Sequence, residues 1–438
     1  MKKDIFLGLI GFGTIGTGIV RLLQENEEII KKRLGARLVI KKIVDIDIET
    51  SRGITVGRDI LTTDPQEILD DPEISIVIEL IGGYEHAKHF ILDAMAKGKH
   101  VVTANKALLA TFGEEIFTVA DERQVNIGFE ASVGGTIPII KTVRESLVGN
   151  NIRSIFGIMN GTSNFILSKM TDDNKSFETV LKEAQELGFA EADPTYDIEG
   201  IDTAHKLALT LALSYGKRVN MEDIYIEGIS DTSLQDIEFA KELGYKIKLL
   251  AIAVQHQDLI EARIHPTMLP FDHILTNVNG NYNAFHFIGD ASGSVFLYGQ
   301  GAGMMPTASA VVSDLVDTAR DMMKGVWRRV PLRSFPEKNI DDIRLLPMDD
   351  VVTNYYFRFS AYDRPGILSK ISGILGNYNI SIAAVIQKGR KQDGIVPVVM
   401  TTHPSREKDV QQALKEIDAL DVVGGKTVLI RIEDNRLQ

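Results

Sequence analysis

The stretch LGLIGFGTIGTGIV at residues 7–20 decides the fold of the N-terminal part of the chain. Ile5–Ile10 is a short apolar run typical of a buried strand, and residues 14–33 have a helical pattern. Between them lies Gly11-Phe12-Gly13-Thr14-Ile15-Gly16, a G-x-G-x-x-G turn. Its glycines permit a tight turn and a close approach of a pyrophosphate to the helix N-terminus, whose N–H groups favour an anion. We predict dinucleotide binding here; the alternative is a purely structural glycine turn.

Short apolar runs and helical patterns alternate as far as residue 130. We expect strands at 38–44, 75–81, 99–103 and 125–131, and helices at 86–97 and 114–123. Such alternation predicts an α/β fold with a doubly wound, mostly parallel sheet of the Rossmann type. Residues 1–130 are therefore predicted to form an NAD(P)-binding domain.

The order of elements changes after residue 130. Predicted helices near 138–147, 175–187 and 203–215 precede several strand-like runs, which suggests an α+β domain for catalysis and dimerisation over 131–325. Its last helix, 306–324, is expected to pack back toward the cofactor domain. Residues 326–350 contain Pro331, Pro336 and Pro347 and are predicted to be a linker. A small β-α-β-β-α-β domain is expected over 351–438.

Composition excludes several classes of protein. The formal net charge is −12, so the basic surface that nucleic acid or an anionic membrane requires is absent. The chain has no cysteine, which excludes disulfides, thiolate metal sites and cysteine nucleophiles. No apolar run approaches the roughly 20 residues of a membrane span. The N-terminal run is too short and glycine-broken for a signal peptide, so we expect a cytoplasmic enzyme with a small-molecule substrate.

The second predicted strand ends at Val44-Asp45. An acidic residue at this position usually bonds the ribose hydroxyls of NAD and repels the extra phosphate of NADP. Arg52 and Arg58 follow, and either arginine can instead hold that phosphate. The sequence thus favours NAD and leaves the choice between NAD and NADP open.

Two lysines are candidates for catalysis. Lys106 ends Thr103-Ala104-Asn105-Lys106, which follows a strand at the carboxyl edge of the predicted sheet, where α/β proteins bind ligands. Lys206 lies four residues after Asp202 on a largely apolar helix, so the two side chains share a face. A buried lysine is costly unless it is paired or used. The alternatives are a solvated surface lysine for Lys106 and a structural ion pair for Asp202–Lys206.

The stretch GFAEADPTYDIEGIDTAHK at residues 188–206 resembles the signature of the homoserine dehydrogenase family. Further motifs of that family follow its order and spacing, so the resemblance covers about residues 4–325. These motifs are Gly11–Gly16, Ile81-Gly-Gly83, Thr103–Lys106, Asn160-Gly-Thr-Ser-Asn164 and Gly301–Ser309.

The resemblance implies an NAD(P)-dependent enzyme that reversibly reduces L-aspartate 4-semialdehyde to L-homoserine. It assigns proton transfer to Lys206 and substrate polarisation near the nicotinamide to Lys106. Glu191, Asp197 and Asp202 are expected to contact the substrate, since carboxylates suit its α-ammonium group. Further cofactor contacts are expected from Thr103, Lys106, Gly188 and Gly303.

The family also binds a monovalent cation, Na⁺ or K⁺, and the matching positions are Glu130, Val133, Gly135 and Ile137. The last three alternate, so their carbonyls would point the same way in an extended strand, and carbonyl oxygens suit a hard cation. The alternative is an ordinary glycine-bearing turn.

The C-terminal domain resembles an ACT domain. Asp363-Arg364-Pro365-Gly366-Ile367 matches its usual strand-to-helix turn, where the glycine allows the backbone to approach a small amino acid. We expect an effector, with threonine favoured, at Asp363, Arg364, Gly366 and Ile367, and a homodimer or homotetramer. Truncation near residue 350 is expected to leave an active enzyme that ignores threonine. The alternative is a domain that only dimerises.

Two other functions compete with this interpretation of the sequence. Aspartate-semialdehyde dehydrogenase handles the same aldehyde but requires a cysteine nucleophile, which this chain lacks. A catalytically inactive, ligand-sensing protein is disfavoured because both lysines and the carboxylate set are intact. Oxidation of NAD(P)H in the presence of aspartate semialdehyde distinguishes an active homoserine dehydrogenase from such an inactive protein.

Overall fold

The computed structural model describes residues 4–388 and 394–434, which form two compact units. The first unit contains Met1–Arg153, Asp202–Asp223 and Asn283–Ile343; the second contains Ser154–Ile201, Ile224–Tyr282 and Arg344–Gln438. Residues from the predicted 131–325 domain contribute to both units. The domain bounds drawn from the sequence therefore stay a prediction.

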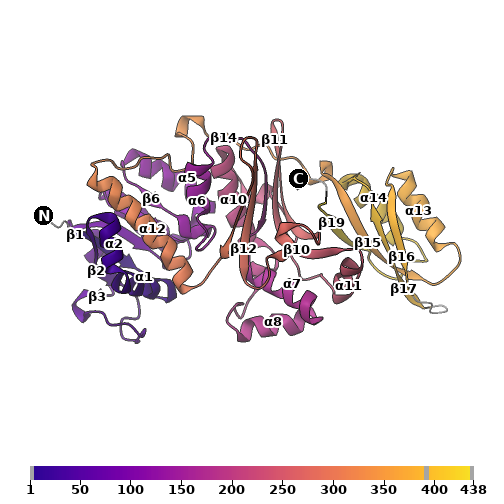
Figure 1. The fold of residues 1–438 in the computed structure, drawn as a ribbon, viewed down its shortest axis with the longest axis horizontal. Coiled ribbons are helices and arrows are strands. Elements are labelled where there is room, and N and C mark those ends of the chain that lie inside the picture. Colours follow the sequence, from indigo (N-terminus) through magenta and orange to yellow (C-terminus); the bar gives the residue numbers. More distant parts are fainter. Residues whose placement is uncertain (1–3, 389–393, 435–438) are drawn as a thin grey trace. The chain divides into compact units, whose positions relative to one another are not determined.

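A parallel sheet forms the centre of the first unit (Figure 1). Its order is β3-β2-β1-β4-β5-β6, and every neighbouring pair is parallel. This confirms the doubly wound fold, because the chain begins in the middle of the sheet and builds outward in both directions. The strands are β1 (Asp4–Ile10), β2 (Arg37–Val44), β3 (Leu61–Thr62), β4 (Ile74–Glu79), β5 (His100–Thr103) and β6 (Ile127–Gly128).

Helix α1 (Thr14–Glu25) packs directly on α12 (Met304–Met323), although the two are far apart in sequence. A Cβ on Gly18 would lie 2.8 Å from Met304 Cγ and 3.2 Å from Ala308 Cβ, so glycine is needed for this contact. Val311 and Leu315 of α12 join the buried core formed by the central strands. The N-terminal part of the unit also contains α2 (Glu27–Leu34), α4 (Glu85–Ala96) and α5 (Lys106–Glu122).

Helix α5 begins eight residues earlier than the sequence pattern predicted, which was residue 114. Asn105 causes the early start, since its side chain accepts a hydrogen bond of 3.1 Å from the Leu108 N–H and so caps the helix. Lys106 is consequently the first residue of a helix rather than part of a loop.

The remaining elements of the first unit include the candidate catalytic helix α10 (Ile201–Tyr215) from Asp202 onward. The residues predicted as a helix at 138–147 form α6 (Ile139–Lys141) and a π-helical turn, Thr142–Ser146. Strands β12 (Tyr282–Gly289) and β13 (Gly293–Gln300) are neighbours. The predicted linker is partly structured, because β14 (Asp341–Asp342) pairs in parallel with β8 (Lys217–Arg218).

One continuous sheet runs through the second unit in the order β7-β10-β11-β19-β15-β17-β16. Strands β7 (Ile152–Ile158), β10 (Tyr245–His256) and β11 (Leu259–Pro270) pair antiparallel. Strand β19 (Val428–Ile432) of the C-terminal domain pairs in parallel with β11, with Thr267 opposite Arg431. The C-terminal domain thus extends the sheet of the preceding region, a pairing that the sequence did not indicate.

The C-terminal domain has the predicted β-α-β-β-α-β order. Helices α13 (Ile367–Asn377) and α14 (Glu407–Asp418) cover one face of β15 (Val352–Tyr362), β16 (Ile382–Gln387), β17 (Ile395–Thr402) and β19 (Figure 1). Tyr355, Phe357 and Phe359 point into the core beneath these helices. Since side chains alternate along a strand, Tyr356 and Arg358 face the other way.

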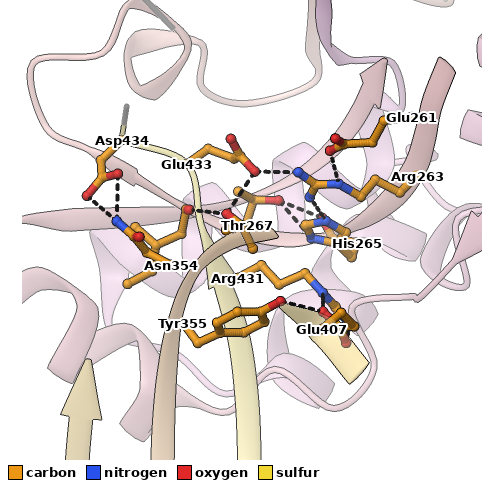
Figure 2. A network of polar contacts seen from close by, with 12 residues as sticks. Glu261, Arg263, His265, Thr267, Asn354, Tyr355, Glu407, Arg431, Glu433 and Asp434 are labelled. Carbon is orange, nitrogen blue, oxygen red and sulfur yellow. Dashed lines mark hydrogen bonds and ion pairs between the residues drawn. The ribbon is translucent and has the colours of Figure 1, made fainter. Parts of the chain in front are cut away.

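Buried charged side chains cross the β11–β19 junction (Figure 2). Arg263 on β11 pairs with Glu261 at 2.7 Å and with Glu433, which follows β19. Arg431 on β19 donates two hydrogen bonds to Glu407, of 2.9 and 2.6 Å. We call these five residues, Glu261, Arg263, Glu407, Arg431 and Glu433, the arginine network. Each of their side chains is at most 3% exposed, so the network is sealed from solvent.

Besides α13 and α14, the second unit contains α7 (Gly161–Asp173), α8 (Phe177–Glu186), the single turn α9 (Thr195–Ile198) and α11 (Leu234–Glu242). Within residues 4–388 and 394–434, no helix is both long and apolar enough to span a membrane.

Candidate active site

The three motif glycines of the 11–16 turn have distinct roles. Gly11 has a φ of +104°, and a Cβ there would lie 2.8 Å from the Leu80 carbonyl carbon. A Cβ on Gly16 would collide with the Gly11 carbonyl oxygen, which holds α1 tightly against β1. Gly13 instead borders open space within 4 Å. The turn therefore fits a bound pyrophosphate, which requires backbone approach at the middle glycine.

Asp45 is tied to the glycine turn. Its Oδ2 accepts a hydrogen bond of 2.5 Å from the Phe12 N–H, and its Oδ1 lies 3.5 Å from an Arg52 guanidinium nitrogen. Arg52 also donates to the Phe12 carbonyl and lies over the Phe12 ring, 4.8 Å from its centroid. A cation thus accompanies Asp45, while Arg58 is exposed and pairs with Glu49. The same place in the fold thus offers a carboxylate, which suits the ribose of NAD, and a guanidinium, which suits the extra phosphate of NADP.

Glu79 organises the carboxyl edge of the sheet, a role that sequence reasoning missed. Its carboxylate accepts hydrogen bonds from Thr103 Oγ1 at 2.7 Å and from the Ile81 N–H at 2.9 Å. Burial raises the pKa of the Glu79 carboxyl. Asn105 completes the arrangement by donating to the Gly83 carbonyl at 2.7 Å. The available signal was a charged residue ending the apolar run at 74–79.

Asp202 brings the two candidate catalytic lysines together. Its Oδ2 accepts a hydrogen bond of 2.6 Å from Lys206 Nζ, and its Oδ1 lies 3.0 Å from Lys106 Nζ. The side chains of Asp202 and Lys206 are 8% and 9% exposed, and that of Lys106 is 38% exposed. We call these three residues the lysine cluster. They carry one net positive charge, which suits a substrate oxygen that becomes negative during reaction.

Helix α10 explains why Lys206 is buried. Ala204, Leu207 and Leu211 are fully buried on this helix, and Ala208 is 4% exposed. The Lys206 ammonium would be unfavourable in such surroundings without a counter-charge, and Asp202 supplies one from the preceding turn.

In the second unit, Asn160 connects two further motifs of the family. Its Oδ1 accepts a hydrogen bond of 2.8 Å from the Ser163 N–H and caps α7, while its Nδ2 donates to Asp197 Oδ1 at 2.7 Å. Ser163 Oγ donates to the Asp197 carbonyl at 2.7 Å. Residues 195–200, which we call the Asp197 turn, are thereby held against the start of α7.

Gly188 and Glu191 lie after α8. Gly188 has a φ of +74°, and its N–H donates to the Gln185 carbonyl at 3.1 Å, ending the helix. Glu191 is exposed, and its carbonyl accepts from Gln185 Nε2 at 3.1 Å. In the first unit, Gly303 has a φ of +122° and immediately precedes α12. Each glycine adopts a backbone conformation that L side chains rarely adopt.

The predicted cation positions do not form an extended strand, so that geometric expectation was wrong. Glu130–Ser132 is a 3-10 turn, and Gly135 has a φ of +58°. Close packing explains the turn, because a Cβ on Gly135 would lie 2.5 Å from the Gly301 carbonyl carbon. The Ile137 carbonyl accepts from the Ile139 N–H at 2.8 Å. Val133 and Ile137 are buried.

Glu130 also holds the element that follows this turn. Its carboxylate accepts hydrogen bonds from the Ile140 and Lys141 N–H groups at 2.8 and 2.9 Å. Burial, together with the neighbouring Asp314 carboxylate, raises the pKa of Glu130 to about 7. The Glu130 side chain thus ties the turn to the start of α6.

The predicted effector turn lies where α13 begins. Gly366 has a φ of +90° and borders open space, and the Asp363 N–H donates to the Gly394 carbonyl at 3.0 Å. Asp363 Oδ2 is buried without a hydrogen-bond partner among the described residues. Arg364 lies over the Tyr362 ring, 5.5 Å from its centroid, and Ile367 is buried.

Comparisons with known proteins agree with this geometry. Residues 138–316 match the homoserine dehydrogenase family, residues 11–130 match the NAD binding domain of homoserine dehydrogenase, and residues 355–422 match the ACT domain. A homoserine dehydrogenase of Neisseria gonorrhoeae is 44% identical over 98% of this chain and 99% of its own length.

Solved structures give the same result. The crystal structure of a homoserine dehydrogenase from Thiobacillus denitrificans is 47% identical, with a TM-score of 0.93 over 99% of both chains. A hyperthermophilic archaeal homoserine dehydrogenase in complex with NADPH is 28% identical, with a TM-score of 0.62 over 74% of this chain and 98% of its own. The chain therefore belongs to the homoserine dehydrogenase family, whose members are oxidoreductases, and carries a C-terminal ACT domain.

Proposed function

We propose that the chain interconverts L-aspartate 4-semialdehyde and L-homoserine, with Lys206 as the proton donor and acceptor. Bound NADH or NADPH supplies a hydride to the aldehyde carbon. The substrate oxygen then becomes alkoxide-like, and the Lys206 ammonium donates a proton to it. Lys106 binds the same oxygen and stabilises its charge, while Asp202 holds both ammonium groups. In the reverse direction, Lys206 accepts the proton.

The observation that carries this proposal is the convergence of two lysines on one buried carboxylate. A structural ion pair on α10 would explain Lys206 alone, but it does not explain why Lys106 arrives from the start of another helix. Oxidation of NADH and NADPH by the purified protein, with and without aspartate semialdehyde, tests the activity directly. A protein that binds the substrate but does not consume the reduced cofactor would be the ligand-sensing alternative.

Substrate recognition is proposed to involve Glu191, Asp197 and Asp202. A carboxylate suits the α-ammonium group of homoserine. Because both Asp202 oxygens contact lysines, we assign Asp202 first to positioning them. Asp197, held by Asn160 and Ser163, is then the better-fixed candidate for the ammonium group.

For the cofactor we propose a preference for NAD, resting on Asp45, with further contacts from Thr103, Lys106, Gly188 and Gly303. The archaeal relative was solved with NADPH, and Arg52 lies beside Asp45. The preference therefore depends on which of these two side chains faces the ribose. Kinetic comparison of NAD and NADP on the wild-type protein is the direct measurement.

A monovalent cation, Na⁺ or K⁺, is proposed at the turn that contains Glu130, Val133, Gly135 and Ile137. Tight turns can direct successive carbonyls inward as strands cannot, so the turn geometry is compatible with carbonyl ligands. The cation would position the turn and take no part in the chemistry. Activity that is unchanged after both ions are replaced by a bulky organic cation would contradict this proposal.

For the ACT domain we propose that L-threonine binds at Asp363, Arg364, Gly366 and Ile367 and lowers activity. The buried Asp363 oxygen without a partner supports a ligand with a hydrogen-bond donor. Gly366→Val should weaken threonine binding in calorimetry, since it fills open space and disfavours the positive φ. Homodimer or homotetramer assembly and a cytoplasmic location stay predictions.

A further inference from the structure

A short segment connects the Asp197 turn to the C-terminal domain. Residues 227–236, which we call the bridge segment, run from the end of β9 (Tyr225–Ile226) into the first turn of α11. The Ile229 N–H donates to the Ile198 carbonyl at 2.8 Å, and Ser230 Oγ donates to Glu199. A Cβ on Gly228 would lie 2.5 Å from the Ile198 carbonyl oxygen. The middle of the bridge segment thus lies backbone to backbone against the Asp197 turn.

The first end of the bridge segment is held by Arg431 of β19. Glu227 Oε2 accepts hydrogen bonds from Arg431 Nη1 at 2.8 Å and from the Tyr225 hydroxyl at 2.9 Å. The Arg431 guanidinium also lies over the Tyr225 ring, 5.0 Å from its centroid. Arg431 is itself fixed by the two hydrogen bonds to Glu407 and is only 1% exposed. This anchor therefore belongs to the core of the C-terminal domain.

The second end is held by Arg358 of β15. The fully buried Asp236 carboxylate accepts hydrogen bonds from Arg358 Nε at 2.6 Å, from Arg358 Nη2 at 2.9 Å and from the Tyr356 hydroxyl at 3.0 Å. Strands β15 and β19 are paired neighbours. One sheet of the ACT domain therefore holds both ends of a segment whose middle holds the Asp197 turn.

The packing leaves room for this segment to move. A cavity of about 250 Å³ is lined by the Asp197 turn, the bridge segment and β19, including Glu199, Glu227, Gly228, Ser230, Val428 and Leu429. A dense core would resist displacement, whereas a cavity permits a small shift of the backbone.

We propose that Arg358 and Arg431 are positioning residues for the Asp197 turn and act through the bridge segment. This inference rests on the proposed function, in which Asp197 contacts the amino-acid substrate. A change in the ACT sheet shifts the two anchors, and the shift reaches the Asp197 turn through Gly228, Ile229 and Ser230. The consequence is a change in the KM for homoserine, with the KM for the cofactor and kcat less affected.

Glu227→Met tests the proposal, because it keeps the side-chain length and removes the contacts with Arg431 and Tyr225. We expect the KM for homoserine to rise about fivefold or more, the lower range of coupling between sites. In Glu227→Gln the KM for homoserine should return part of the way to the wild-type value, because the amide oxygen still accepts hydrogen bonds from both donors. Glu242→Met is the matched control: Glu242 also pairs with a residue of the ACT domain, Lys388, and is equally exposed, at 38% against 37%.

Hydrogen exchange supplies a readout that does not depend on activity. In Glu227→Met the amide of Ile229 should exchange faster than in the wild type, with no such change in Glu242→Met. Unchanged KM and unchanged exchange in Glu227→Met would overturn the proposal, as would an equal rise of the KM in Glu242→Met. If the wild-type protein does not oxidise homoserine, the proposed function is wrong, and the exchange of Ile229 alone decides whether the bridge segment is held as described.

Discussion

The lysine cluster and the arginine network are both built from buried charges, yet they differ in exposure and in the sign of the excess charge. In the arginine network, three carboxylates surround two guanidinium groups, and Glu261, Arg263 and Glu433 are each 1% exposed. In the lysine cluster, two ammonium groups share Asp202, and Lys106 is 38% exposed. A network sealed from solvent stabilises one arrangement of strands, whereas a cluster that solvent reaches can also meet a substrate.

His265 extends the arginine network without adding charge. Burial and the charges of Arg263 and Arg431 lower the pKa of His265 well below its usual value, so the ring is neutral. Its Nε2 therefore accepts a hydrogen bond from Arg263, and its Nδ1 donates to the Pro266 carbonyl at 2.9 Å. This histidine therefore has a structural role.

The largest expected effect concerns the arginine network and is seen on truncation near residue 350, which the sequence predicts to leave an active enzyme that ignores threonine. Truncation removes Glu433 from Arg263 and exposes the edge of β11. Breaking a buried ion pair costs about 3–5 kcal/mol, so the shortened chain should unfold at a clearly lower urea concentration. A chain shortened only after Asp434 keeps the network and is the control. Equal urea midpoints for the two would show that the network does not stabilise the fold.

The next effect concerns the lysine cluster. Lys206→Ala should lower kcat by roughly 100-fold or more, because it removes a general acid–base group. Cofactor affinity should change little. Lys169→Ala is a matched control, since Lys169 and Asp173 form an exposed pair with the same four-residue spacing. Turnover near that of the wild type in Lys206→Ala would contradict the assignment of proton transfer.

The Asp45–Arg52 pair is intermediate in exposure between the arginine network and Lys106, since both of its side chains are 15% exposed. Asp45→Ser should increase the ratio of kcat/KM for NADP to that for NAD by about tenfold, as expected when one charged contact is lost. Arg58→Ser serves as the comparison, because Arg58 is exposed and pairs with Glu49. If the wild type already strongly prefers NADP, Asp45 does not face the ribose and the proposed preference is wrong.

Lys248 is a buried ammonium group that has no carboxylate partner among the described residues, and it tests how such a group affects stability. Its Nζ donates to neutral oxygens, among them the Val278 carbonyl at 2.7 Å and Asn164 Oδ1 at 3.0 Å. Burial lowers the pKa of Lys248 to about 7 in the folded protein. The unfolded chain therefore binds more protons between pH 7 and 10, and stability should rise with pH by up to about 1 kcal/mol per pH unit.

Lys248→Met should flatten this rise. Urea unfolding at several pH values between 7 and 10 measures it, and Lys182→Met, at an exposed position of α8, should keep the wild-type slope. An identical slope in Lys248→Met and the wild type would mean that Lys248 titrates alike in the folded and unfolded chains.

Much of the fold was predictable from local patterns. The strand–glycine–helix pattern at 5–20 indicated the doubly wound sheet, and the order of the patterns over 351–438 indicated the β-α-β-β-α-β domain. The start of α5 was not predictable from hydrophobic periodicity, because it depends on the Asn105 cap. The cation turn was also mispredicted, since its shape depends on packing against Gly301, far away in the sequence.

The candidate site was likewise predictable only in part from the sequence. The four-residue spacing of Asp202 and Lys206 placed them on one helix face, and the family motifs named Lys106 and Asp197. Only the tertiary structure showed that Asp202 contacts both lysines, that Glu79 holds Thr103, and that Asn160 holds Asp197. Spacing defines neighbours within one element, whereas contacts between elements depend on how those elements pack.

The sequence by itself determined the cofactor turn, the order of elements, the family and the identity of the charged residues. The tertiary structure alone decided which of those charges meet, and it joined the ACT domain to the neighbouring sheet through β11 and β19. The physical reason is that hydrophobic periodicity and turn residues act over a few neighbouring positions. Strand pairing and buried ion pairs instead join residues such as Arg263 and Glu433, which are 170 positions apart.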